Sequence, residues 1–287
     1  MHRSGTSAAT RSLSFLGLAT CRPFDLLPAL AGNERGHWES RSLTLLNESL
    51  LNEMDAAWWC PPRSDEVIRW SAQLERTTFD RLRDAHRAAH PAARPWVWKD
   101  PRLCLTLPVW KEALAGRYAT VLMIRNPLEI ADSLAVRNGM NRTWALALWE
   151  RYLSSAVEHL EGSPVWLSRY GDLLTDPPGW CRTASQVLRS NGLEVELRPE
   201  TIDHVRSFLT EDLRHHTHAP DLSSGELTER QKALWHWLDS SVGFHPRLST
   251  TSLRSGPPED ESLELATHRR TFIEMRQNGV DHDDDEG

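Results

Sequence analysis

Cysteine is scarce in this sequence of 287 residues, and the four cysteines are scattered along it. A structural zinc site or a disulfide scaffold needs cysteines at characteristic spacings such as Cys-x-x-Cys, and no such pair occurs. The pattern argues against both classes and favours a reducing compartment. The four residues are Cys21, Cys60, Cys104 and Cys181.

The chain also lacks a long apolar run. A membrane-spanning helix needs about 18–20 consecutive apolar residues, and no stretch approaches that length. The apolar segment Leu13–Ala19 follows Arg11 as in a signal peptide, but Ser14 interrupts it and no clean basic region precedes it. The sequence therefore predicts a soluble, cytoplasmic protein without a membrane span.

An excess of basic residues is absent too, because 33 Lys and Arg stand against 40 Asp and Glu, a formal net charge of −7. Five of the acidic residues lie in the last seven positions, so the rest of the chain carries only −2. Bulk charge thus predicts neither a nucleic-acid partner nor an acidic membrane partner. An anionic cofactor would need local positive charge.

What the sequence does contain is a small, polar and basic segment placed directly before an amphipathic helix that begins near Ala8. The free N–H groups of a helix's first turn and the positive end of its dipole attract anions, and glycine lets a ligand approach the backbone. The spacing is not that of a Walker loop, since no Lys follows the glycine. A polar tail before an ordinary capped helix is the alternative interpretation. The candidate anion-binding residues are Arg3, Ser4, Gly5, Thr6 and Ser7.

A second anion site is predicted after the apolar run Thr120–Ile124, which is typical of a strand buried in a parallel sheet. Arg125 stands at the carboxyl end of this strand, and Pro127 fits the first position of the helix that follows. Ser133 lies eight residues after Arg125, just over one turn into that helix. Ligands of open α/β sheets bind at such strand ends, so we expect both side chains to converge on one phosphate.

Together, HRSGTS before a helix and RNPLEIADS after a strand resemble the sulfotransferases that use 3′-phosphoadenosine 5′-phosphosulfate (PAPS). The resemblance continues through VWKDPR at 97–102 and SRYGDLLTDP at 168–177, so four motifs in the family's order cover residues 1–192. It implies an α/β, P-loop-like fold with a parallel β-sheet flanked by helices on both faces. It also implies that the first loop cradles the 5′-phosphosulfate, that Arg125 and Ser133 hold the 3′-phosphate, and that Tyr170 lies by the adenine.

The resemblance further places Lys99 beside the transferring group and puts Arg3 where many family members have Lys. Many members carry a His two residues after the strand-end Lys, but this chain has Pro101 there. Other branches use a Glu a few dozen residues after the loop, which Glu39 matches. A general base needs hydrogen-bond reach and a suitable pKa. Glu39 is the candidate base, a helix N-terminal carboxylate is its alternative role, and the rivals are His37 and Asp100.

Strands alternating with helices along the chain predict a parallel sheet covered on both faces. We expect a sulfotransferase domain over residues 1–250 and a polar, partly disordered acidic tail over 251–287. The first strand is missing, because nothing precedes His2 except Met1; either the true start lies upstream or the central strand has been lost. Helices are expected over 41–54, 64–90, 106–115, 141–161, 176–190, 199–209 and 226–238, and short strands over 96–98 and 165–167.

The functional hypothesis is transfer of a sulfuryl group from PAPS to a hydroxyl of a carbohydrate, a glycolipid or another small metabolite, without a metal. Two alternatives stay open: a P-loop kinase or other nucleotide-binding protein, and an N-terminally truncated, inactive sulfotransferase homologue. A small-molecule or glycan acceptor is the expected partner, no nucleic-acid partner is expected, and the oligomeric state is left open. The one histidine cluster lacks a Cys or carboxylate at ligand spacing, which argues against zinc; it comprises His215, His216 and His218.

Overall fold

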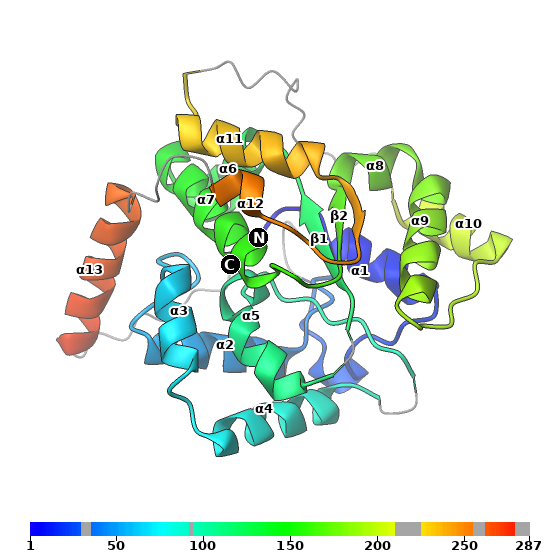
Figure 1. Cartoon of the computed structure of the whole chain (residues 1–287), viewed down its shortest axis with the longest axis horizontal. Helices are drawn as coiled ribbons and strands as arrows, with labels where there is room; N and C mark the ends of the chain where they lie inside the picture. Colours follow the sequence, from blue (N-terminus) through cyan, green and yellow to red (C-terminus); the bar gives the residue numbers. More distant parts are fainter. Residues whose placement is uncertain (30–35, 92–93, 117, 210–224, 255–261, 279–287) are drawn as a thin grey trace.

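The sheet of this protein is small and most of its described chain is helical. A computed structural model describes residues 1–29, 36–91, 94–116, 118–209, 225–254 and 262–278. Within these residues three strands lie in the order β1 (Thr120–Ile124), β2 (Val165–Arg169) and β3 (Gly243–His245) (Figure 1). The α/β class expected from the sequence is confirmed.

The described sheet is mixed and not all-parallel. Strands β1 and β2 run parallel, with Val121 opposite Trp166, whereas β3 pairs antiparallel with β2 through Phe244 opposite Trp166. A three-residue edge strand is too short to show a period-2 pattern, which is why the sequence did not predict β3.

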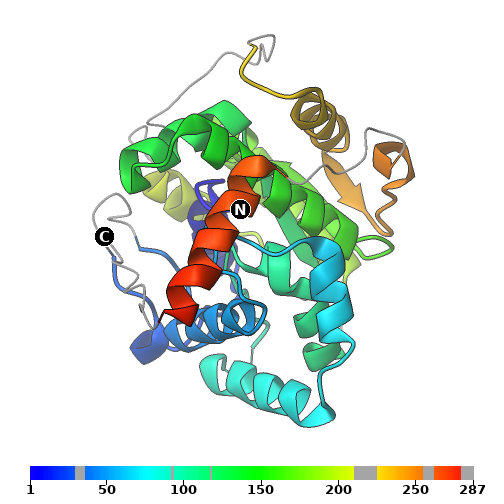
Figure 2. The same ribbon diagram turned by 90° about the vertical axis from the view of Figure 1, so that its left-hand side faces the viewer.

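Helices surround this sheet, and Figure 1 shows α1, α9 and α10 on one side of it and α2, α4 and α5 below it. Helix α7 is the most buried helix, and it contacts α5, α6, α11 and α13. Figure 2, which looks at the side of α13, shows this helix across the front of the molecule. The helices are α1 (Thr6–Phe15), α2 (Arg41–Glu53), α3 (Ser64–Ser71), α4 (Arg76–Ala89), α5 (Leu103–Leu114), α6 (Pro127–Asn138), α7 (Arg142–His159), α8 (Tyr170–Thr175), α9 (Pro177–Ser190), α10 (Pro199–Phe208), α11 (Glu229–Ser240), α12 (Thr251–Arg254) and α13 (Leu263–Gln277), with a short 3-10 helix at Pro23–Asp25.

The strand–helix unit β1–α6 forms as the sequence predicts. The apolar side chains of β1 are buried from Leu122 onward. Asn126 then caps α6, because its side chain accepts a hydrogen bond from Leu128 N at 2.9 Å, and Pro127 occupies the first helical position. The helix ends at Asn138, and Gly139, with a φ of 65°, forms its left-handed C-cap. This unit carries both Arg125 and Ser133.

Three expectations about local structure need correction. The single helix expected over 64–90 is two helices, because the chain turns between Ala72 and Glu75. One helix of that length would extend about 40 Å, well beyond the 12-residue helix α5 on which both α3 and α4 pack. The strand expected over 96–98 is a single bridge, in which Ala19 N bonds to Pro95 O at 2.8 Å. The helix expected over 106–115 begins one turn earlier, at Leu103.

Helix α13 lies in the stretch for which the sequence predicts a polar tail. Its Leu265 and Phe272 are buried, and the Phe272 ring lies 5.4 Å from that of Trp59. The domain boundary at residue 250 stays a prediction, and the terminal acidic run lies outside the described residues.

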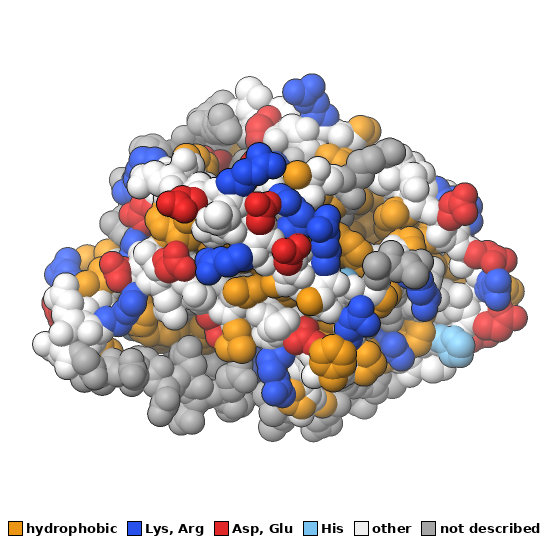
Figure 3. All heavy atoms as spheres, turned by 90° about the horizontal axis from the view of Figure 1, so that it is seen from below, with side chains coloured by type: hydrophobic (Ala, Val, Ile, Leu, Met, Phe, Trp, Pro, Cys, Tyr) orange, Lys and Arg blue, Asp and Glu red, His pale blue; other side chains and the backbone are white. Residues whose placement is uncertain are grey.

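Two further features to compare with the sequence are the distribution of charge on the described surface and the length and apolar character of the described helices. On the face seen from below, basic and acidic side chains are interspersed with apolar ones and form no field of one sign (Figure 3). Of the helices in the described ranges, none has both the length and the apolar character that crossing a membrane requires.

A buried histidine joins three helices in the core. His159 at the end of α7 lies 2.8 Å from Ser64 Oγ through Nε2 and 3.2 Å from the Cys104 carbonyl through Nδ1. A carbonyl only accepts, so Nδ1 carries the proton and Nε2 accepts from the Ser64 hydroxyl. Burial lowers the pKa of His159 to about 4, so the ring is neutral at pH 7.

This arrangement predicts that His159 makes the protein less stable as the pH falls. The unfolded-state pKa is about 6.5, so between pH 6.5 and 4 the unfolded chain binds a proton that the folded chain refuses. The stability that the neutral, hydrogen-bonded His159 ring contributes is fully present above pH 6.5 and is lost as the pH falls toward 4. His159→Gln should therefore lower the slope of unfolding free energy against pH, near pH 5, by up to about 1.4 kcal/mol per pH unit.

Urea unfolding at a series of pH values measures this slope. His236→Gln is the matched control, because His236 is exposed on α11. Equal slopes for the wild type and His159→Gln would contradict the assignment.

Candidate functional site

The segment before α1 forms a tight turn that leaves the first turn of the helix uncapped. Gly5 is the N-cap with φ 80° and ψ 13°, and no side chain caps the helix there. Arg3 also has a positive φ, of 62°. The first turn of α1 carries no acidic residue, and the buried Ser4 Oγ has no hydrogen-bond partner among the described residues. This loop therefore has the backbone geometry of an anion site.

The ring of Tyr170 packs directly on this loop. Tyr170 begins α8 immediately after β2 and is buried. A Cβ atom on Gly5 would lie 2.1 Å from Tyr170 Cδ2, so only glycine fits under the ring. The guanidinium of Arg125 lies 5.3 Å from the centroid of the same ring. Two sequence-predicted motifs, 165 residues apart, thus meet at Gly5.

The third motif joins them from the end of β1 and from α6. Arg3 Nε donates to Ser133 Oγ at 2.6 Å, and a terminal nitrogen of Arg125 donates to the Arg3 carbonyl at 3.1 Å. Arg125 Nε also donates to Glu129 Oε2 at 2.7 Å, a partner that the sequence analysis did not name. The four-residue spacing between Arg125, just before the N-cap of α6, and Glu129 in its first turn is the pattern that could have shown it.

Positive charge is concentrated around Arg3. Burial, and then the nearby charges of Arg137 and Arg125, lower the pKa of Arg3 to about 10. A bound anion would offset both the desolvation and the repulsion among these guanidinium groups. The positive charge around Arg3 and the backbone geometry of the loop therefore both favour a bound anion.

The candidate catalytic residues Glu39 and Lys99 are in direct contact. Lys99 Nζ donates to Glu39 Oε1 and, at 3.3 Å, to the His37 carbonyl, and both charged side chains are nearly buried. Ser7 Oγ donates to the same His37 carbonyl at 3.2 Å, which connects this pair to the first turn of α1. The ring of Trp38, which precedes Glu39 in the chain, lies with its centroid 4.4 Å from the Arg11 guanidinium.

Asp100 does not join this group. Its side chain is fully buried and accepts hydrogen bonds from Asn47 Nδ2 and from the backbone N–H of Arg102, both at 2.8 Å. Burial raises the pKa of Asp100. Asn47 in turn accepts from the indole N–H of Trp110 at 2.7 Å. Asp100 therefore belongs to a structural network between α2 and α5.

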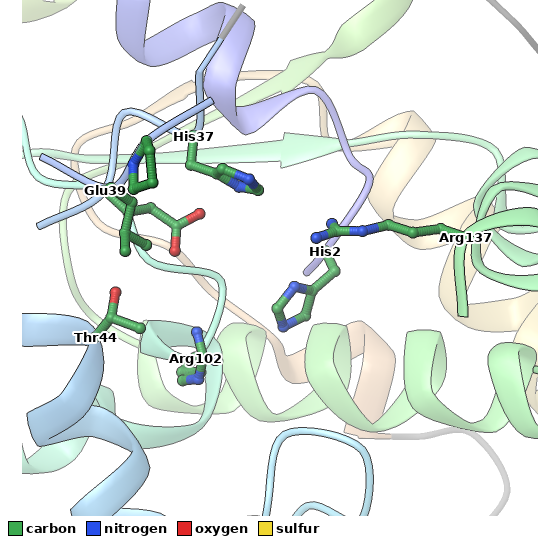
Figure 4. Close-up of a pocket in the computed structure, with 8 residues that line it drawn as sticks. His2, His37, Glu39, Thr44, Arg102 and Arg137 are labelled. Atoms are coloured by element: carbon green, nitrogen blue, oxygen red, sulfur yellow. The ribbon is translucent and has the colours of Figure 1, made fainter. Parts of the chain in front are cut away.

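A cavity of about 80 Å³, partly open to solvent, lies beside Glu39 and His37 (Figure 4). Burial, and secondarily the charge of Lys99, lower the pKa of His37 to about 4, so its ring is neutral at pH 7. The sequence analysis missed most of the lining; the position of Arg137 four residues after Ser133 on α6 is the pattern that could have found one member. The lining comprises His2, Leu27, Pro28, His37, Glu39, Thr44, Arg102 and Arg137.

A search of the described residues finds no group of three or more His, Cys, Asp and Glu side chains arranged to hold a metal ion. The cluster that raised the question of zinc lies outside those residues; it comprises His215, His216 and His218.

The contact between Gly5 and Tyr170 predicts that Gly5→Ala is more destabilising than Gly139→Ala. Both glycines have positive φ, but no atom lies within 4 Å of a Cβ built on Gly139. Gly139→Ala carries only the backbone strain, of order 1–2 kcal/mol, whereas Gly5→Ala adds the overlap with the ring. Thermal and urea unfolding measure the difference.

A double-mutant cycle with Tyr170→Ala should show that the ring causes the extra loss, because removing it relieves the overlap. Equal losses at the two glycines, or full additivity with Tyr170→Ala, would contradict the packing.

Comparison of the chain with family models, with curated proteins and with solved structures found no match. A function for these residues is therefore inferred from their sequence motifs, their geometry and their chemistry.

Proposed function

We propose that this chain is a PAPS-dependent sulfotransferase that moves a sulfuryl group to a hydroxyl of a carbohydrate, a glycolipid or another small metabolite. The P-loop-like fold and a cytoplasmic location are parts of the same proposal. The observation that carries it is the junction at the start of α1, where Arg3 bonds to Ser133 and Gly5 packs under Tyr170. Residues from three distant segments, each first named from a sequence motif, meet at one uncapped helix N-terminus.

The residues at this junction fit an anionic nucleotide. The N–H groups of the first turn of α1 suit a 5′-phosphosulfate, and Ser4 Oγ is a buried polar atom in need of a partner. Ser133 accepts from Arg3 and keeps its hydroxyl hydrogen to donate to a 3′-phosphate. Arg125 brings a guanidinium beside the Tyr170 ring. PAPS would supply an activated sulfuryl group with a good leaving group.

The contact between Glu39 and Lys99 supports a division of roles in the transfer. Glu39 lines the cavity and is placed to remove the proton from a hydroxyl held there. Lys99 supplies a fixed positive charge next to it, of the kind that stabilises charge developing on transferred and leaving oxygens. Arg3 supplies a second such charge from the loop. His37, with its lowered pKa, is a weak base, and Asp100 is sealed in the core.

The first test compares two nucleotides that differ only in the 3′-phosphate, PAP and AMP. Calorimetric titration should show PAP binding more tightly than AMP. Ser133→Ala should reduce this preference by about tenfold, because a hydrogen bond to a charged group contributes roughly 1.5–3 kcal/mol. AMP affinity should fall less than PAP affinity, because Ser133 also holds Arg3 of the loop that would bind the 5′ end of both nucleotides.

Ser155→Ala is the matched control, since Ser155 is equally buried but lies on α7. Absence of PAP binding at millimolar concentration would overturn the proposed function. Equal losses for PAP and AMP would remove Ser133 from the 3′-phosphate site.

The second test addresses the base. Glu39→Gln keeps the size of the side chain but removes its basicity, so turnover should fall by about 10²-fold or more, the typical contribution of a general base. PAP affinity should change little. Transfer of labelled sulfuryl from PAPS to hydroxylated acceptors, found by screening, measures turnover.

His37→Ala is the comparison within the same cavity. Loss of turnover in His37→Ala together with an active Glu39→Gln would move the base to His37 and leave the nucleotide site unaffected.

A further inference from the structure

Four buried side-chain nitrogens without hydrogen-bond partners belong to residues that line the same cavity. They are His2 Nε2, His37 Nε2, Arg102 Nε and Arg137 Nε, and none of them has a partner in the part of the chain that the structure describes. Arg102 is also more than nine-tenths buried. Each such unpaired buried group costs about 1–3 kcal/mol. The arginine Nε atoms can only donate, and a neutral imidazole Nε2 can donate or accept, so the four atoms around one space indicate a polar ligand that offers acceptor atoms.

The charges around the cavity show where such a ligand would carry negative charge. Arg102 is paired with Asp100 and Glu48, and Glu39 is paired with Lys99. Arg137 forms no ion pair with any residue in the described ranges, although it lines the same space.

The two imidazoles add hydrogen-bonding capacity without charge. Burial, and then the charge of Arg102, lower the pKa of His2 well below its ordinary value, and the pKa of His37 is lowered as well. Because both rings are neutral, an anion in the cavity meets the positive charge of Arg137 and no charge on either histidine. Arg137 therefore gives the lining its excess positive charge.

We propose that the acceptor carries a negatively charged group, a carboxylate or a sulfate ester, in addition to the hydroxyl that receives the sulfuryl group. The anionic group would bind Arg137 and the unpaired N–H donors, and the hydroxyl would face Glu39. Figure 4 shows the Arg137 guanidinium and the Glu39 carboxylate reaching into the space from opposite sides. This inference rests on the proposed function, because the hydroxyl chemistry comes from it.

The anion in question is not the one assigned to the nucleotide. Arg125, Ser133 and Tyr170 are absent from the described lining of the cavity, whereas they surround the loop before α1. A charge-assisted hydrogen bond from Arg137 would be among the strongest contacts that the cavity offers, so it should dominate selection among acceptors.

The test uses small probes that contain one hydroxyl and differ in charge. Titration calorimetry of the full chain should show 4-hydroxybenzoate and 4-hydroxybenzenesulfonate binding about tenfold more tightly than the neutral methyl 4-hydroxybenzoate. Arg137→Gln should abolish this preference, and Arg137→Lys should retain part of it. Arg182→Gln, at an exposed arginine of α9, is the matched control and should behave as the wild type.

Equal affinity for the acids and the ester, or a preference that survives in Arg137→Gln, would overturn the inference. So would a failure of both acids to bind at about 10 mM, where even weak charge recognition is measurable. Saturating PAP should leave the binding of 4-hydroxybenzoate unchanged, and displacement by PAP would assign Arg137 to the nucleotide and overturn the inference. Failure of PAP to bind, with the acid preference intact, would instead remove the proposed function alone.

Discussion

The hydrogen bond from Arg3 to Ser133 is the contact on which the candidate site depends. It joins a loop at the start of the chain to a helix 130 residues later, and the carbonyl of Arg3 is bound in turn by Arg125. These bonds fix a loop whose backbone at Arg3 and Gly5 has positive φ. The Tyr170 ring then covers Gly5. With its loop held from three sides, the first turn of α1 presents its N–H groups in one fixed direction.

Electrostatics divides the site into two parts. Around the loop, burial and then the charges of Arg137, which lines the adjoining cavity, and of Arg125 lower the pKa of Arg3. At the cavity, Glu39 forms a nearly buried ion pair with Lys99. An anion therefore suits the first part, and proton transfer suits the second. Both Glu39 and Arg137 line the cavity, so one small ligand there can contact the proposed base and a positive charge at the same time.

Local pattern was sufficient for much of the fold. The apolar run of β1 and the Pro127 start of α6 identify both elements, because a buried parallel strand and a helix first turn have strong composition rules. Hydrophobic periodicity gave wrong helix bounds where tertiary contacts determine the break between helices. It could not break residues 64–90 into α3 and α4, since both halves are amphipathic and only their packing on α5 requires the turn. Strand β3 and helix α13 had no sufficient local pattern.

For the site, the sequence by itself determined which residue types stand at strand ends and helix starts, and so named Arg3, Gly5, Ser133 and Tyr170. Those positions follow from local rules, since a strand end or a helix N-terminus is defined within a few residues. Only the tertiary structure decided which groups meet. Folding buries Asp100 in a network of core hydrogen bonds. It pairs Arg125 with Glu129 and Lys99 with Glu39, and it places Arg137 in the lining of a cavity. The physical reason is that pairing, burial and desolvation depend on distances between segments that the chain brings together only on folding.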